Sequence, residues 1–371
     1  MKNNAGTQKE QMQKSENSTW RQECVELSRK LEERYNAGQP LFTKKQLSSL
    51  AEQIANKTRI VQITGMDGKT TWDPIEWDYF QNEWVKTDSR SDLKANRLVI
   101  PCPSDQPDEL PKPSCSVNVE RGKMPVQSTP AQVAMALGKM SAEFDKYENA
   151  WKASPQCRKL KDILFSVPIP NAINRIICFG LGDLLDDSDD ENEQIGSSNG
   201  SSEVRSHVQH AVALTMARVL EERTGREIRC HSQDPAYTQA TIEFLQSRNI
   251  MVLHDPQGFV EVDETTLVFS VAPSVPVKQI VTELARPAII IWDTMMPVDK
   301  DSREWELMRF PNGNETWISP WISDPDSART RKMEEEEYTS YPFPEDPIAL
   351  GDIQILVKKA SNEGKDTAQR L

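Results

Sequence analysis

Between residues 170 and 300 the sequence alternates short, almost wholly apolar runs with longer segments of helical period. The apolar runs cover residues 175–180, 227–230, 250–253, 266–270 and 288–292. The helical segments between them cover residues 203–223, 236–247 and 277–284. Strands that are apolar on both sides must be covered on both faces, which favours a parallel sheet. Right-handed crossovers then give a Rossmann-like α/β domain, a mostly parallel sheet with helices on both faces.

Changes in composition along the chain predict four segments. We expect a disordered or helical tail over residues 1–40 and an extension with helices, a hairpin and a linker over residues 41–129. The Rossmann-like domain then covers residues 130–300, and a C-terminal extension covers residues 301–371.

The Rossmann-like segment opens with a long helix. Apolar residues recur every three or four positions from Val133 to Trp151, and Pro155 should kink or end the helix. At the other end of the chain, Ile353 and Val357 belong to an alternating pattern that favours an added edge strand.

The N-terminal extension contains a helix signal followed by a hairpin signal. Thr43 is a good N-cap for a helix that ends near Asn56. The stretch 63–71 looks like the tail of a phosphate loop, but Asp67 and Gly68 favour a tight turn, and Trp72-Asp73-Pro74 follows where a phosphate loop would open a helix. The sequence therefore favours a β-hairpin over an ATP site.

Charge and cysteine usage exclude several classes of protein. The net charge of −13 repels phosphate backbones, so we expect no nucleic-acid partner. The longest apolar run, 288–292, is too short to span a bilayer, and the polar start of the chain predicts no secretory signal. The six cysteines form no CxxC pair and the four histidines do not cluster with them, so we expect no metal site and a cytoplasmic or nuclear location.

Two glycines follow the first strand of the predicted sheet. Open α/β sheets bind ligands at the carboxyl ends of their strands, and Gly180 and Gly182 would let a ligand approach the backbone of this turn, with Asp183 beside it. Seven carboxylates between Asp183 and Glu193 would repel a pyrophosphate unless a metal joined them. A tight structural turn is the alternative.

Three further strand ends supply candidates for the same crevice. Asp234, before Pro235, can hold ribose hydroxyls or else begin the next helix. Pro273 and Ser274 follow the fourth strand, where Ser274 can alternatively cap a helix, and Asp293 ends the last strand. The cofactor, if there is one, stays unknown at this stage.

Some polar residues are predicted to lie at the surface, and no catalytic or ligand-binding role is proposed for them. His207 and His210 are three apart in a helical segment, where we expect solvent-facing positions. The run 334–337 is expected to form a solvated charged face. No nucleophile and base pair can be proposed from spacing alone.

The order of these motifs resembles the sensitivity-to-red-light-reduced-like (SRR-like) domain family, and most closely its fungal members. The strings that carry the resemblance are IICFGLGD, VQHAVAL, SQDPAY, TLVFSVAPSVPVKQI and AIIIWD. The family pattern implies roles for the glycine turn, for Gln209 in the next helix and for Asp234 with its proline. Many members carry Pro-His-Cys after the fourth strand, where this chain has Pro273 and then Ser274 and Val275.

What the resemblance implies is regulation. Plant members are associated with light signalling and circadian control, and animal members with control of haem biosynthesis. We therefore expect a regulatory protein that has protein partners and senses a small ligand. An enzyme that uses S-adenosylmethionine or NAD(P) is one alternative, and a decayed enzyme kept for protein contacts is another.

Overall fold

The structure is a computed structural model. It describes residues 33–35, 37–64, 70–74, 77–80, 83–86, 130–170, 172–185, 202–296, 306–309, 315–318, 324–346 and 348–360. The chain divides into two units. The first contains Met1–Gly122 and Met296–Pro325, and the second contains Lys123–Met295 and Asp326–Leu371.

The described part of the first unit is a helix with short antiparallel hairpins. Its elements are α2 (Lys44–Ala55), β1 (Ile60–Thr64), β2 (Thr70–Pro74), β3 (Trp77–Phe80), β4 (Glu83–Lys86), β10 (Glu306–Arg309) and β11 (Glu315–Ile318). The strands pair as β1 with β2, β3 with β4 and β10 with β11.

Helix α2 starts where the sequence predicts, at a capping box formed by Thr43 and Gln46. Its apolar stripe, which includes Leu47 and Leu50, is buried, as is Val61 of β1. The antiparallel pairing of β1 with β2 confirms the predicted hairpin, because a phosphate loop would lead into a helix. The turn itself, residues 65–69, lies outside the described residues.

A seven-stranded sheet forms the centre of the second unit. Its strands are β5 (Arg175–Phe179), β6 (Arg229–Gln233), β7 (Ile250–Val252), β8 (Thr266–Ser270), β9 (Ile289–Asp293), β12 (Tyr338–Pro342) and β13 (Ile353–Lys358). Their order is β12-β13-β9-β8-β5-β6-β7. The five strands from β5 to β9 are parallel to one another, and β13 runs antiparallel to both of its neighbours, β9 and β12. The mostly parallel Rossmann-like sheet is therefore confirmed.

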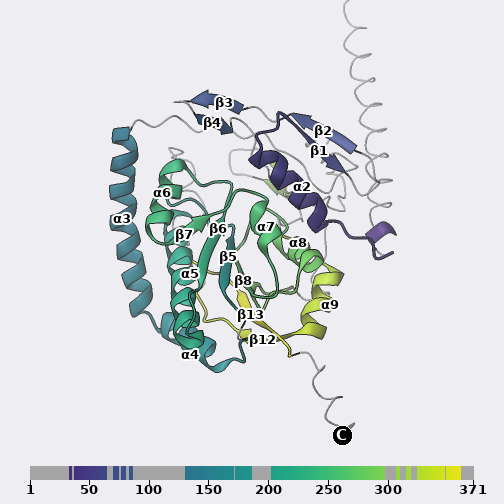
Figure 1. Ribbon diagram of the computed structural model, residues 1–371. Helices are drawn as coiled ribbons and strands as arrows, with labels where there is room; N and C mark the ends of the chain where they lie inside the picture. Colours follow the sequence, from purple (N-terminus) through teal and green to yellow (C-terminus); the bar gives the residue numbers. More distant parts are fainter. Residues whose placement is uncertain are drawn as a thin grey trace, which may run out of the picture. The chain divides into compact units, whose positions relative to one another are not determined.

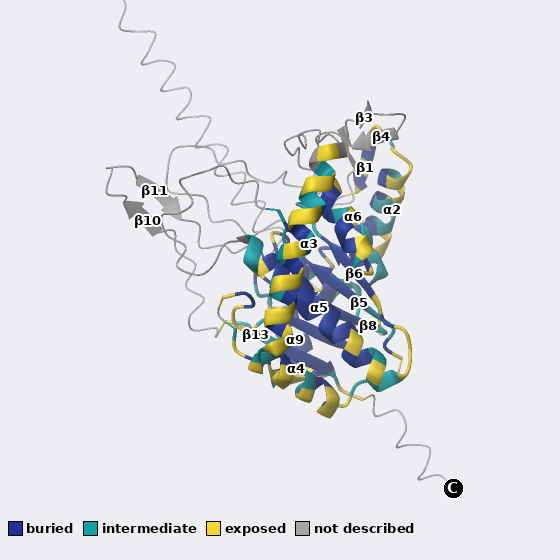
Figure 2. Ribbon diagram, turned by 90° about the vertical axis from the view of Figure 1, so that its left-hand side faces the viewer, coloured by how far each residue is buried: buried dark blue, intermediate teal, exposed yellow. Residues whose placement is uncertain are grey.

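Helices cover both faces of this sheet (Figure 1). They are α3 (Pro130–Ala153), α4 (Pro155–Ser166), α5 (Ser202–Thr224), α6 (Gln239–Ser247), α7 (Gln257–Glu261), α8 (Val277–Leu284) and α9 (Ala328–Glu337). Helix α5 packs on β5 and β6, and α3 and α4 form an outer layer on it, whereas α8 packs with α7 and α9. Figure 2 shows the central strands β5, β6 and β8 almost wholly buried and the outer side of α3 exposed.

Several sequence predictions need correction. Pro155 does end the long helix, but it also opens α4, because Ser154 caps the new helix and Pro is favoured at its first position. The alternating residues from Ile353 to Val357 form β13, which is an inner strand; the edge strand is β12. Helices α4, α7 and α9 were missed. Most of the tail predicted over residues 1–40, and all of residues 87–129, where the linker of the extension is expected, lie outside the described residues.

Candidate functional site

The strand order places a switch point between β5 and β8. The chain passes from β5 to β6 and β7 on one side and then returns to β8 on the other side of β5. In open α/β sheets, ligands bind outside the carboxyl ends of the strands at such a point. The loops that follow β5 and β8, residues 180–185 and 271–276, therefore flank the candidate site.

The two predicted glycines are needed for close packing of these loops. Gly180 and Gly182 have φ angles of 72° and 76°, in the left-handed region that side chains disfavour. A Cβ atom on Gly180 would lie 2.7 Å from the Cα and Cβ atoms of Pro273, and one on Gly182 would collide with the Ser206 hydroxyl. The glycine turn thus contacts the loop after β8 and the first turns of α5.

Asp234, the candidate residue after β6, is hydrogen-bonded to the glycine turn. The Oδ2 atom of Asp234 accepts a hydrogen bond of 2.8 Å from the backbone N–H of Gly182. Its Oδ1 atom accepts one of 2.8 Å from the N–H of Ala236. Asp234 does not begin helix α6, whose N-cap is Thr238, so this alternative from the sequence is wrong.

Asp183 makes the reciprocal connection from the glycine turn to α6. Its Oδ2 atom accepts the backbone N–H of Thr238 at 2.7 Å, and its Oδ1 atom accepts the Thr241 hydroxyl at 2.7 Å and the N–H of Leu185 at 2.8 Å. The two aspartates therefore form a double brace between the loops that follow β5 and β6.

Gln209 lies one turn further along α5 than Ser206. Its amide donates a hydrogen bond of 2.7 Å to the backbone carbonyl of Ala349, and its side chain is buried. The observed contact of Gln209 is therefore with the loop that precedes β13, and the hydrogen bond holds that loop against α5.

The loop after β8 approaches the end of β9. Ala272 has a φ angle of 43°, and its backbone hydrogen-bonds the carboxyl group of Asp293. Burial raises the pKa of Asp293, although this hydrogen bond and the Lys278 ammonium oppose the rise. Ser274 is exposed and does not cap α8, whose N-cap is Pro276, so the capping alternative is wrong.

A comparison of the sequence with known protein families finds a match. The SRR1 domain family matches residues 159–344, which is 186 of the 371 residues. The chain belongs to the SRR1 domain family. No curated protein matches the chain significantly.

The SRR1 domain contains a buried hydrogen-bond chain that the sequence did not predict. His210 Nδ1 lies 2.6 Å from the Ser206 carbonyl oxygen, which only accepts, so Nδ1 carries the proton. The unprotonated Nε2 atom then accepts the Tyr237 hydroxyl at 2.8 Å, and that hydroxyl accepts Ser232 Oγ–H at 2.6 Å. Burial lowers the pKa of His210 to about 4 and raises the pKa of Tyr237.

A second buried polar group lies beside β9. Glu334 accepts hydrogen bonds of 2.8 Å from the Trp292 indole and 2.9 Å from the Gln354 amide. Nearby, the buried ammonium of Lys278 pairs with Asp326 at 2.8 Å. The expectation of a solvated face over residues 334–337 is therefore wrong at Glu334, which burial gives a raised pKa.

The expected surface positions of the two histidines are also wrong. His207, like His210, is fully buried, and its ring stacks on Tyr147 of α3 with ring centroids 5.6 Å apart. Within the part of the chain that the structure describes, neither ring nitrogen of His207 has a hydrogen-bond partner, and its Nε2 atom lies 3.9 Å from Oε1 of Glu203. Only an even apolar pattern on all sides of α5 could have signalled that this helix is buried on every side from Ala211 to Ala217.

Neither a metal cluster nor a membrane span stands out in the described residues. Across them, no three His, Cys, Asp or Glu side chains are grouped as metal ligands would be. None of the helices in the same residues combines the length and apolar character of a transmembrane helix.

Proposed function

We propose that this protein is a regulatory SRR1-domain protein of the fungal type, whose domain senses a small ligand at the switch point between β5 and β8. The observation that carries the proposal is the meeting of two tight loops at that point. The glycine turn touches Pro273, and Ser274 is exposed beside it. Backbone of this kind lets a ligand come close to the chain.

The two aspartates fit a structural role beside a binding site better than an acid–base role. Asp183 and Asp234 each accept backbone N–H groups, so their oxygens already stabilise the loops. Ligand contact would then come from the loop backbone and Ser274, while the brace keeps the site in shape. Protein partners and a cytoplasmic or nuclear location complete the proposal.

An enzyme that uses S-adenosylmethionine or NAD(P) is the second candidate. The glycine turn lies next to the first turns of α5, through the contact of Gly182 with Ser206, as it would in a dinucleotide-binding domain. A sensing domain and an enzyme could both bind a nucleotide at this site. Binding is therefore tested first, and activity only afterwards.

Thermal shift measures whether the site binds. We expect one of S-adenosylmethionine, NADPH, ATP or haem to raise the melting temperature; at 100 times the dissociation constant, binding stabilises the fold by about 2.7 kcal/mol. Ser274→Arg should abolish the shift by placing a large charged side chain at the proposed site. Ser166→Arg, an exposed serine at the end of α4, is the matched control and should keep it.

Two results would contradict the proposal. One is a wild-type protein whose melting temperature none of the four ligands changes. The other is a ligand whose shift survives in Ser274→Arg, because that ligand would bind elsewhere.

A further inference from the structure

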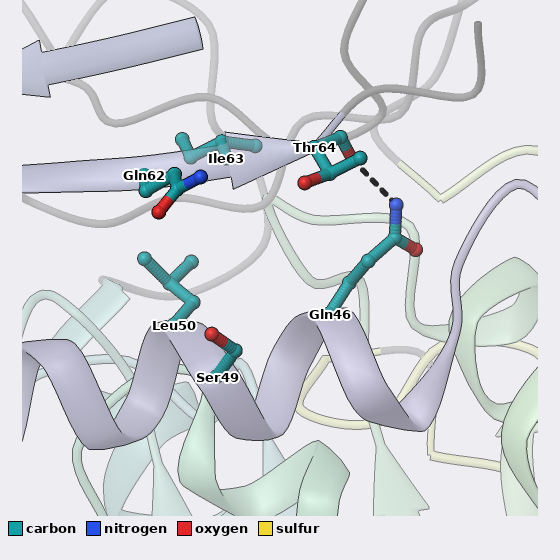
Figure 3. Close-up of a pocket in the computed structure, with 6 residues that line it drawn as sticks. All are labelled: Gln46, Ser49, Leu50, Gln62, Ile63 and Thr64. Carbon is teal, nitrogen blue, oxygen red and sulfur yellow. Dashed lines mark hydrogen bonds between the residues drawn. The ribbon is translucent and has the colours of Figure 1, made fainter. Parts of the chain in front are cut away.

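The outer edge of strand β1, opposite β2, is hydrogen-bonded by side chains of α2. The amide of Gln53 accepts the backbone N–H of Gln62 at 2.7 Å and donates to the carbonyl of the same residue at 3.1 Å. The amide of Gln46 donates to the carbonyl of Thr64 at 2.6 Å, as Figure 3 shows. Gln53 thus reproduces the pair of bonds that a residue of a neighbouring antiparallel strand would make.

These glutamine contacts are exchangeable. They lie at exposed positions, beside a small pocket between α2 and β1 that Figure 3 shows with its lining residues. A peptide strand that paired with β1 would replace each side-chain bond with a backbone bond of the same kind. The exchange costs little, because hydrogen bonds are traded one for one.

The outer face of the hairpin offers apolar contacts to such a strand. Val61 and Ile63 are buried, so the alternate residue Ile60 points to the opposite face, where it is 52% exposed. Trp72 is opposite Gln62 in the pairing and therefore shares the face of Ile60; it is 64% exposed. Alternate side chains of an added strand would lie next to Ile60 on this face.

The net charge of the helix and hairpin over residues 37–74 indicates what kind of peptide would bind at this edge. Residues 37–74 contain five Lys and Arg and three Asp and Glu, a net charge of +2, whereas the whole chain has −13. Lys57 and Arg59 are exposed directly before β1. An acidic peptide is favoured here, and a second copy of the same edge is disfavoured by like charge.

We propose that the outer edge of β1 is a β-augmentation site for an acidic, extended peptide segment of a partner protein, with apolar residues at alternate positions. Gln53 covers the edge in the absence of the partner. This covering also protects the edge from unselective strand pairing. The site is independent of the ligand proposed for the SRR1 domain.

The test uses the full chain and a labelled probe, acetyl-Glu-Val-Glu-Val-Glu-Val-Glu-amide, in fluorescence anisotropy. Gln53→Ala removes the competing side chain and should tighten binding by about fivefold to a hundredfold, given the usual net strength of two hydrogen bonds. Ser48→Ala on the same helix is the matched control and should bind like wild type. Adding Gln62→Pro to Gln53→Ala removes the outward N–H and should abolish binding.

Three outcomes would overturn the proposal. Gln53→Ala and Ser48→Ala could bind the probe equally well. The lysine counterpart of the probe could bind as tightly as the acidic one. Gln53→Ala could form a dimer in sedimentation and bind no probe, which would assign the edge to a second copy. The comparison of Gln53→Ala with Ser48→Ala stands even if the proline variant fails to fold.

Discussion

Gly182 and Gly138 occupy opposite environments. Gly182 has a φ angle of 76° and lies against Ser206, whereas Gly138 lies inside α3, where no atom of the described residues comes within 4 Å of an added Cβ atom. Gly182 is required because its backbone is left-handed and because Ser206 leaves no room for a side chain. Neither reason applies to Gly138. At the scale of single residues, the glycine turn is therefore a demanding feature even without a ligand.

We predict opposite effects for alanine at these two glycines. Gly182→Ala should lower the free energy of unfolding by about 1–2 kcal/mol for the left-handed backbone alone, and further through the clash with Ser206. Gly138→Ala should raise it by about 1 kcal/mol, as expected inside a helix. Urea unfolding measures both. If Ser206→Ala fails to recover any of the loss in the Gly182→Ala background, the contact with Ser206 is not responsible.

The buried histidines make stability depend on pH. Burial lowers the pKa of His207 and of His210 from 6.5 to about 4, so below pH 6.5 the unfolded chain binds protons that the folded chain does not. The free energy of unfolding should therefore fall between pH 6.5 and pH 4, by about 1.4 kcal/mol per pH unit for each histidine. The charge of Glu143 raises the pKa of His207 and so opposes the effect of burial, whereas the charges of Lys139 and Lys146 lower this pKa further.

His207→Phe separates the two contributions. The phenyl ring can keep the stacking on Tyr147 and cannot take up a proton, so the pH dependence should become shallower by one histidine's share. Urea titrations at several pH values between 4 and 7.5 measure the slope. An unchanged slope in this variant would show that His207 does not stay neutral in the fold.

At the scale of elements, α9 is attached to the sheet through one side chain of its glutamate run. Glu334 is buried and bonded to Trp292 and Gln354, while Glu336 of the same helix is exposed. Glu334→Ala should lower the free energy of unfolding by about 1–3 kcal/mol, because it leaves the Trp292 indole without its acceptor. Glu336→Ala should change it by less than about 0.5 kcal/mol. Equal effects in urea unfolding would rule out the buried bond as the reason.

The elements that could be predicted are those whose sequence period is strong. Strands β5, β8 and β9 are buried on both sides and therefore stand out as apolar runs. Helix α7 has only five residues and α9 is almost wholly polar, so neither carries a helical apolar stripe. Strand β12 has three exposed residues, one of which is its terminal proline, and this composition hides its place at the sheet edge.

The candidate site was predictable in position but not in detail. Parallel strands bring their carboxyl ends to one edge, which is why Gly182 and Asp234 could be expected together before their hydrogen bond was seen. The roles of the side chains depend on partners that are far away in sequence. Asp183 bonds to Thr238 and Thr241, and Gln209 to Ala349, and no local pattern signals such contacts.

At the scale of the whole molecule, the chain combines an SRR1 domain with an N-terminal helix and hairpin of opposite charge character. The net charge is +2 over residues 37–74 and −13 over the chain. The two proposed sites differ accordingly, one for a small ligand at the sheet and one for an acidic peptide at β1. The division of the chain into residues 1–40, 41–129, 130–300 and 301–371 stays a prediction.

Hydrogen–deuterium exchange with each of S-adenosylmethionine, NADPH, ATP and haem tests the ligand site most directly. For the ligand that binds, we predict slower exchange in peptides that cover residues 180–185 and 271–276, and no change in α4. Slower exchange that spares both loops and appears elsewhere in the SRR1 domain would contradict the assignment of the switch point between β5 and β8 as the sensing site.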